Sequence, residues 1–140
     1  PIWDIKLEFT ESLLMEHTQQ AVKRLCALRD LGVKLSIDDF GTGYSSLSYL
    51  QQFPIDQIKI DRSFINAMDQ KEESRKIVKS ILALANSLGI STVAEGVETR
   101  SQLDQLFNLS CGSVQGYFIA KPMPWTDLCD FINNWRKIKF

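Results

Sequence analysis

Two hydrophobic patterns alternate along the chain. Short β-branched or aliphatic runs, which are typical of buried strands, recur along the sequence. These runs are Ile5–Phe9, Val33–Ile37, Gln57–Ile60, Ile90–Ala94 and Ser113–Tyr117. Between them lie longer segments with apolar residues three or four positions apart, a spacing that predicts amphipathic helices. This alternation predicts parallel strands joined by helical crossovers.

The predicted helices are identified by their apolar stripes. The stripes are Val22, Leu25, Leu28 and Leu31; Ile77, Ile81, Leu84, Ala85 and Leu88; Leu103, Leu106 and Phe107; and Leu128, Phe131, Ile132 and Trp135. Gly32 and Gly89 follow the first two stripes, and we expect each to end its helix. A further short helix is expected at Ser46–Gln51, with Ser45 as its N-cap.

Two folds are compatible with this alternation: a doubly wound sheet and a (β/α)8 barrel. A complete barrel takes about 250 residues, and the 140 residues of this chain would hold only about five of its eight units. The pattern therefore leaves two alternatives open, a small open α/β domain or the C-terminal part of a barrel. Because the first residue is Pro1 and not Met, we expect the sequence to be a piece of a longer protein.

Composition and charge exclude several classes of protein. Hydrophobic residues make up 44% and the formal net charge is −1, so we expect a globular domain that binds no polymeric nucleic acid. No apolar run is long enough to span a membrane, and no membrane contact is expected from this segment. His17 is the only histidine, which rules out a histidine metal cluster or a Ser-His-Asp triad within the chain. Three scattered cysteines favour a reducing, cytoplasmic setting.

Acidic residues close several of the predicted strands. Glu8, the pair Asp38 and Asp39, and Glu95 stand at or near the C-terminal ends of three separate apolar runs. In parallel α/β folds these ends share one face, so the carboxylates would meet in one pocket and repel each other unless cations neutralise them. Oxygen ligands alone indicate Mg²⁺ or Mn²⁺. Any one acidic residue could instead be only a helix cap, but their repetition on separate strands favours a metal site, with Lys59 as a fixed positive charge.

A glycine-containing segment follows the paired aspartates. Gly41 and Gly43 permit positive φ angles, and the segment is not a phosphate-binding P-loop because no Gly-Lys-Ser/Thr follows. By composition alone it could be an ordinary turn. Its position beside Asp38 and Asp39 favours a mobile active-site loop.

At these residues the chain resembles the EAL-type family of cyclic di-GMP phosphodiesterases. The matching stretches are Glu8–Ser12, Asp38–Leu47, Ile58–Phe64, Ala94–Thr99, Gln115–Tyr117 and Lys121–Met123. The resemblance implies that residues 1–140 are the C-terminal portion, about five βα units, of a single (β/α)8 domain. It also implies hydrolysis of cyclic di-GMP to the linear dinucleotide with two Mg²⁺ or Mn²⁺ ions, Ca²⁺ giving an inhibited form.

The resemblance assigns a role to individual residues. It assigns metal binding to Glu8, Asp38, Asp39 and Glu95. It assigns catalytic roles to Lys59, Glu95 and Gln115. Lys59 would hold the attacking water, and Gln115 would lie close to the metal-bound waters. Supporting positions would be Glu11, Glu98, Gly41, Thr42 and Gly43, with Glu98 holding the loop after Asp39. Arg62 and Pro122 are candidate substrate contacts, although Arg62 could equally pair with Asp61 or Asp56.

The chain also departs from the family pattern. The Glu-Ala-Leu segment and the strand that carries a metal-binding Asn both lie upstream of Pro1, so we expect these 140 residues alone to be inactive. Cys111-Gly112-Ser113 stands where the family often has an acidic residue. Open sheet edges predict pairing with a second copy or with the missing N-terminal half of the barrel. The alternative function is a catalytically inactive cyclic di-GMP receptor or protein-interaction module of the same fold.

Overall fold

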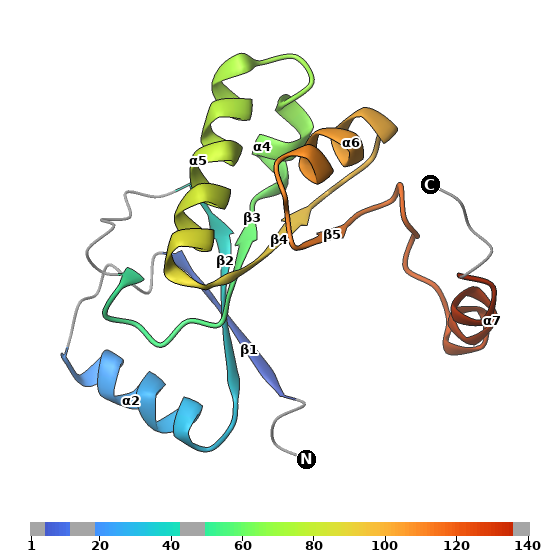
Figure 1. Ribbon diagram of the computed structural model, residues 1–140. Helices are drawn as coiled ribbons and strands as arrows, with labels where there is room; N and C mark the ends of the chain where they lie inside the picture. The colour runs from blue at the N-terminus through green and yellow to red at the C-terminus, as the bar shows by residue number, and fades with distance from the viewer. Residues whose placement is uncertain (1–4, 12–18, 43–49, 136–140) are drawn as a thin grey trace.

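Five parallel strands form a single sheet in which each strand lies beside the next one along the chain. The computed structural model describes residues 5–11, 19–42 and 50–135. The strands are β1 (Lys6–Thr10), β2 (Lys34–Phe40), β3 (Gln57–Ile60), β4 (Ser91–Glu95) and β5 (Ser113–Gln115), in the order β1-β2-β3-β4-β5 (Figure 1). A doubly wound sheet reverses its strand order at a switch point, whereas a barrel does not. The sequential order therefore selects the partial α/β barrel of the two predicted folds.

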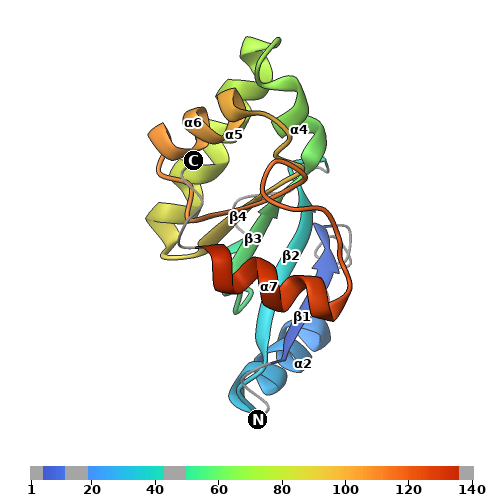
Figure 2. The same cartoon turned by 90° about the vertical axis from the view of Figure 1, so that its right-hand side faces the viewer.

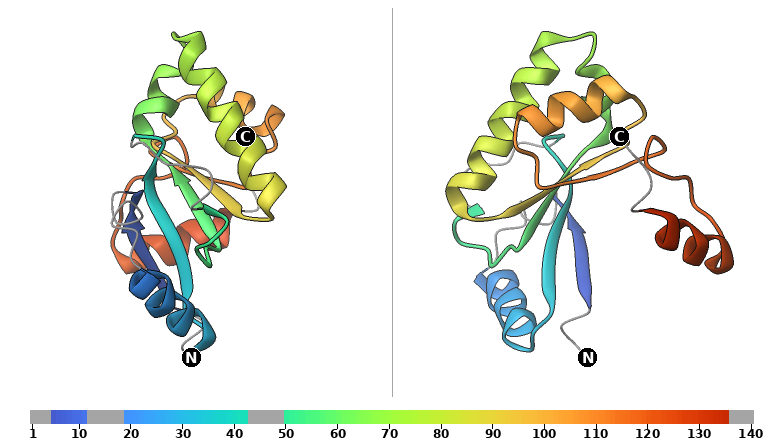
Figure 3. Two further views of the ribbon diagram at one scale, coloured as in Figure 1. Left: turned by 90° about the vertical axis from the view of Figure 1, so that its left-hand side faces the viewer. Right: turned by 45° about the vertical axis from the view of Figure 1, so that its right-hand side comes forward.

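Five helices accompany this sheet in the described part of the chain. They are α2 (Gln19–Asp30), α4 (Arg62–Ala67), α5 (Glu72–Leu88), α6 (Arg100–Asn108) and α7 (Trp125–Trp135). Helices α2 and α5 lie on one side of the strands, whereas α7 stands on the opposite side, clear of the sheet in Figure 1 and in front of it in Figure 2. The right-hand view of Figure 3 shows the same separation. Helix α4 was not predicted from the sequence, and the helix expected at Ser46–Gln51 lies largely outside the described residues.

The strand register gives the two faces of the sheet different chemistry. Ile37, Ile58 and Ala94 are fully buried and belong to the core cluster, on the face covered by the helices. Lys59 pairs with Val93, and Glu95 pairs with Gln115, so these polar side chains share the opposite face. Side chains alternate between faces along a strand. The sheet thus separates an apolar core from a polar face that carries the candidate site.

A β-bulge interrupts this alternation in β2. Ile37 pairs with Ile58 and Phe40 pairs with Ile60, so β2 has one more residue than β3 between these two pairs. The extra residue allows Phe40 to return to the core, where it is 4% exposed. Asp39 absorbs the change with a φ of 53°, a left-handed conformation in which Asp is more tolerable than most residues. The bulge therefore lets two consecutive aspartates serve the same site.

The helix faces differ in part from the predicted stripes. Helix α5 buries Val78, Ile81, Leu82 and Ala85, while Ile77 is 38% exposed. In α6 the predicted stripe residue Leu106 is buried, but Phe107 from the same stripe is 81% exposed. The sheet covers only one side of each helix, so apolar residues at the border of the stripe, such as Ile77 and Phe107, stay exposed. Gly89 ends α5 in a left-handed conformation, as predicted.

Among the described residues, no helix combines the length and hydropathy that a membrane crossing requires.

Candidate metal centre

Lys59 lies at the centre of the polar face and contacts carboxylates from three strands. Its Nζ atom is 2.8 Å from an oxygen of Glu8 on β1, 3.1 Å from Asp38 on β2 and 2.9 Å from Glu95 on β4. The lysine side chain is only 12% exposed, so solvent screens these ion pairs less than it screens surface pairs. The parallel register thus brings together the charges that the sequence places at separate strand ends.

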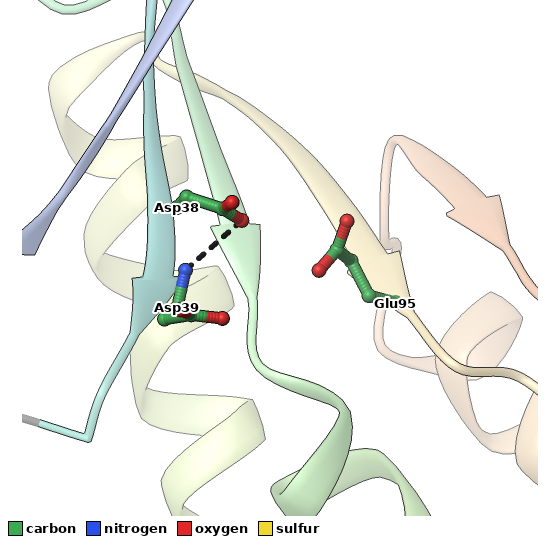
Figure 4. Close-up of side chains that lie close together, drawn as sticks. All are labelled: Asp38, Asp39 and Glu95. Carbon is green, nitrogen blue, oxygen red and sulfur yellow. Dashed lines mark hydrogen bonds between the residues drawn. The ribbon is translucent and has the colours of Figure 1, made fainter.

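Three carboxylates also approach one another closely enough to share a cation. Asp38, Asp39 and Glu95 each offer an oxygen, and these oxygens all lie within 4.8 Å of one another. Figure 4 shows the two aspartates on β2 facing Glu95 on β4, with the backbone N–H of Asp39 donating to Asp38 Oδ1 at 3.1 Å. Hard oxygen donors of this kind suit Mg²⁺ and Mn²⁺. Glu8 does not belong to this close group and is linked to it through Lys59.

The charges at this centre change the protonation of its members. Although burial by itself lowers the pKa of Lys59, hydrogen bonds to Glu8, Glu95 and Asp38 outweigh that effect and raise it above the usual range for lysine. Burial and the neighbouring charge of Asp38 raise the pKa of Asp39. Lysine therefore stays protonated at neutral pH, while the aspartate cluster favours any cation that relieves its repulsion.

Glu11 holds the start of the loop that follows β2. Its side chain is 3% exposed, and its Oε2 atom accepts a hydrogen bond of 3.0 Å from the backbone N–H of Gly41. Gly41 has a φ of 101°, and a Cβ here would lie 2.9 Å from Phe64 Cε2. Thr42 Oγ1 donates to the backbone oxygen of Asp39 at 2.9 Å. These contacts fix the first turn of the loop, and Gly43 lies outside the described residues.

A cavity of about 240 Å³ opens beside Glu95. Its lining includes Arg62, Glu95, Glu98, Gln115 and Tyr117. Among the described residues, Arg62 forms no ion pair with Asp61 or Asp56; Asp56 instead pairs with Lys34 at 3.2 Å. The guanidinium of Arg62, the carboxylate of Glu95 and the amide of Gln115 therefore line the same cavity.

Two glycines let the β4–α6 loop pack tightly against its neighbours. Gly96 has a φ of 71°, and a Cβ here would lie 2.6 Å from Arg62 Cβ. A Cβ on Gly116 would lie 2.1 Å from the backbone oxygen of Val97. On the same side, Val97 N–H donates to Gln115 O at 3.0 Å, and Phe118 N–H donates to Val97 O at 2.9 Å. The loop after β4 is thus held between α4 and the chain that follows β5.

The structure joins most of the predicted site residues but leaves a few apart. Lys59, Glu8, Asp38, Asp39 and Glu95 form one charged centre, and Gln115 lies next to Glu95 in the sheet. Glu98 lines the cavity, and the hydrogen bond to the loop after β2 comes from Glu11, so the loop-holding role of Glu98 stays a prediction. Pro122 is exposed beyond β5 and does not line this cavity, and its role also stays a prediction.

Asp61 is a contributor to the site that the sequence reasoning did not select. It is the N-cap of α4, where its side chain accepts a hydrogen bond of 2.9 Å from Ser63 N–H. Burial acts to raise the pKa of Asp61, but the hydrogen bonds from Ser63 lower it, and Asp61 in turn helps to raise the pKa of Asp39. Asp61 directly follows the apolar run Gln57–Ile60, just as Asp38 directly follows Val33–Ile37. This position could have identified Asp61 as a site residue from the sequence.

Cys111 is a thiol near β5 whose reactivity we expect to be low. Burial raises its pKa, and its Sγ donates to Ser113 O at 3.2 Å. Because the thiolate is the nucleophile, iodoacetamide should label Cys111 at pH 8 more slowly than it labels free cysteine. Peptide mass spectrometry of timed samples measures this rate, which should still be rising above pH 9. Labelling at the rate of free cysteine at pH 8 would contradict the expectation.

The fold and the site together define a partial α/β barrel with a carboxylate-rich centre at the C-terminal ends of its strands. The profile of the family described as the EAL domain matches residues 1–122. The chain belongs to the EAL domain family, as the sequence motifs indicate.

Relatives and solved structures agree with this assignment. The chain is 46% identical over 132 residues to "Cyclic di-GMP phosphodiesterase NbdA" of Pseudomonas aeruginosa, covering 94% of this chain and 17% of that protein. The solved structure "PaMucR Phosphodiesterase, c-di-GMP complex" is similar with a TM-score of 0.86 and 44% identity, over 91% of this chain and 51% of the other. "Klebsiella pneumoniae BlrP1 pH 9.0 manganese/cy-diGMP complex" has a TM-score of 0.78 and 38% identity, over 86% and 31%. The chain therefore spans only part of the length of the proteins it matches.

Proposed function

We propose that this chain is part of a domain that hydrolyses cyclic di-GMP to the linear dinucleotide with two divalent ions, Mg²⁺ or Mn²⁺. The observation that carries the proposal is the meeting of Asp38, Asp39 and Glu95 within 4.8 Å, next to Lys59. Relatives named as cyclic di-GMP phosphodiesterases, and a similar structure named as a manganese and cyclic di-GMP complex, support it.

The acidic side chains would hold the ions. Asp38, Asp39 and Glu95 would be ligands, and Glu8 would complete the set from β1. When bound, such ions lower the pKa of a coordinated water and neutralise the charge of the phosphodiester. Binding is favoured because the ions relieve the repulsion among the carboxylates, which raises the pKa of Asp39 in their absence.

The neighbouring polar residues would orient water and substrate. Lys59 keeps its proton at neutral pH because its pKa is raised, so it can hold the attacking water by donating a hydrogen bond to its oxygen. Gln115 offers an amide beside Glu95, and Arg62 offers a guanidinium for a phosphate oxygen in the same cavity. In the reaction, the water oxygen forms a bond to phosphorus, a ribose oxygen leaves, and the water proton passes to the leaving side.

The 140 residues by themselves are proposed to be inactive and to need a partner surface. The resemblance to the family implies two further metal ligands, the Glu of the Glu-Ala-Leu segment and an Asn, which these 140 residues do not supply. In the described part of the chain, β1 and β5 are the two edges of the sheet. Unpaired strand edges favour association, with either the rest of the barrel or a second copy. The three free cysteines support a cytoplasmic setting for the segment.

The proposal is tested on the full-length protein that contains this chain. Purified protein is incubated with cyclic di-GMP and Mg²⁺ or Mn²⁺, and the linear dinucleotide is measured by chromatography. We expect turnover that EDTA abolishes and that Ca²⁺ does not support. Binding of cyclic di-GMP in Ca²⁺ without turnover in Mg²⁺ or Mn²⁺ would identify the protein as a receptor instead.

A Lys59→Ala variant tests the role of the lysine. We expect kcat to fall by about a hundredfold or more, the usual effect of removing one positioned hydrogen-bond donor from a reacting centre, because the water loses the donor that orients it. Mn²⁺ binding, measured by calorimetry, should persist because the carboxylates remain. A kcat within a factor of about two of the unaltered protein would refute the assignment. Lys76→Ala, which removes an exposed lysine on α5, is the matched control.

A further inference from the structure

We propose that Asp69 is a positioning residue that fixes the β4–α6 loop, and with it Glu98, against the cavity beside Glu95. Asp69 lies in the turn between α4 and α5, outside the metal centre. Part of its test rests on the proposed function, because it is read from the hydrolysis of cyclic di-GMP. The structural part of the test does not depend on that function.

The Asp69 carboxylate accepts hydrogen bonds from three side chains at the start of α6. Asp69 Oδ1 accepts from Ser101 Oγ at 2.7 Å and from Gln105 Nε2 at 2.7 Å, and Asp69 Oδ2 accepts from Thr99 Oγ1 at 3.2 Å. These donors belong to the N-cap and first turns of α6, which lies beside α4 and α5 in Figure 1. A negative charge at a helix N-terminus is also favoured by the helix dipole. Asp69 thus ties the α4–α5 turn to the start of α6.

The contact with Thr99 continues into the backbone of the loop. Thr99 Oγ1 uses its single hydrogen on Asp69, which directs its lone pairs toward the backbone N–H of Gln102 at 3.1 Å. Gln102, which is 4% exposed, completes the capping box with Thr99. Its side-chain Oε1 accepts hydrogen bonds from Thr99 N–H at 3.1 Å and from Glu98 N–H at 2.7 Å. The backbone of Glu98 is therefore held by a chain of hydrogen bonds that begins at Asp69.

Helix α4 touches the loop at both of its ends. At its first residue, the Arg62 stem packs on Gly96, where a Cβ would lie only 2.6 Å from Arg62 Cβ. Past its last residue, Asp69 holds Thr99. Without Asp69, Gly96 and Val97 remain anchored by Arg62 and by Gln115, but Glu98 and Thr99 lose their outer support. Glu95 keeps its place because it pairs with Gln115 in the sheet.

This division predicts which properties change. Loss of Asp69 should loosen the cavity wall formed by Glu98 and leave the carboxylate centre intact. Substrate binding should weaken while the chemical step is retained. In the full-length protein, Asp69→Ala should raise KM for cyclic di-GMP by about fivefold, the effect of one lost hydrogen bond, with kcat within about twofold.

The experiment combines amide hydrogen exchange with steady-state kinetics on three variants of the full-length protein. Asp69→Ala should speed exchange at the amides of Glu98 and Thr99 by about fivefold, with β2 and β3 unchanged. Asp69→Asn keeps one acceptor oxygen and should give intermediate exchange and KM. Asp104→Ala removes another α6 carboxylate, whose exposed ion pair with Arg100 spans 2.9 Å, and should change neither.

Several outcomes would overturn the proposal. Exchange at Glu98 and Thr99 in Asp69→Ala no faster than in Asp104→Ala would show that Asp69 does not hold the loop. Faster exchange throughout the sheet would show a general loss of stability, and an equal fall of kcat and kcat/KM would place the effect on chemistry. If the unaltered protein hydrolyses no cyclic di-GMP, the proposed function fails, and the exchange measurement alone decides the role of Asp69.

Discussion

Replacing Glu95 by Gln, or Asp38 by Asn, is expected to lower the turnover of cyclic di-GMP by about a hundredfold or more while the protein stays folded. Each amide keeps the size of the carboxylate and can still accept a hydrogen bond from Lys59, whose Nζ lies 2.9 Å from Glu95 and 3.1 Å from Asp38. The amide carries no charge, so its oxygen is a weaker ligand for the divalent ions than the carboxylate. The measurement is kcat in saturating Mg²⁺ or Mn²⁺, with circular dichroism to verify folding.

A matched control separates the loss of a ligand from the loss of a negative charge. Glu72→Gln neutralises an exposed carboxylate on α5 that pairs with Lys76 at 3.0 Å and takes no part in the metal centre. This variant should retain its turnover, because exposed ion pairs contribute little. Near-normal kcat in Glu95→Gln and Asp38→Asn would remove both residues from the ligand set.

Gly116→Ala is expected to destabilise the fold by about 3 kcal/mol and to impair activity as well. A Cβ at this position would lie 2.1 Å from Val97 O and 2.3 Å from Val97 N, and backbone atoms cannot move aside as a flexible side chain can. The hydrogen bonds from Val97 N–H to Gln115 O and from Phe118 N–H to Val97 O would have to break or shift. Since Gln115 and the β4–α6 loop line the cavity, the change should also reach the site.

Gly89→Ala is the control for the conformational cost of losing a glycine. Gly89 has a φ of 68°, but a Cβ there would meet no atom within 4 Å. Its replacement should therefore cost only the left-handed strain, about 1 kcal/mol. Urea unfolding of the full-length protein compares the two variants. Equal losses of unfolding free energy would mean that the contact with Val97 relaxes without cost.

The central strands β2, β3 and β4 were well predicted because they combine buried positions with β-branched residues. Gln57–Ile60 was placed with its observed bounds, and the predicted Val33–Ile37 overlaps β2, which continues to Phe40 through the bulge. The predicted final strand, Ser113–Tyr117, ends earlier at Gln115. The reason is tertiary, since Gly116 leaves the ladder to pack against Val97.

The buried faces of the helices and the short helix α4 were harder to predict from the sequence. Ile77 and Phe107 satisfy helical spacing as well as their buried neighbours do, yet they are exposed because the sheet covers only one arc of each helix. Helix α4 has only six residues, too few to show an amphipathic period. Its N-cap, Asp61, was visible in the sequence, but an acidic residue after a strand has several possible roles.

The succession of strands and helices along the chain, and the acidic residues at the strand ends, could be predicted from the amino-acid sequence alone, because hydrophobic periodicity is a local property. The order of the strands within the sheet, which selects the partial barrel, was decided by tertiary structure. The sequence also carried the motifs of the EAL domain family, which the comparisons confirm. Tertiary structure alone decided how the charges meet. Strand register brought Lys59 into contact with three carboxylates, and the bulge at Asp39 turned two neighbouring aspartates to one side of the sheet. An unbroken strand would have sent them to opposite faces, since its side chains alternate.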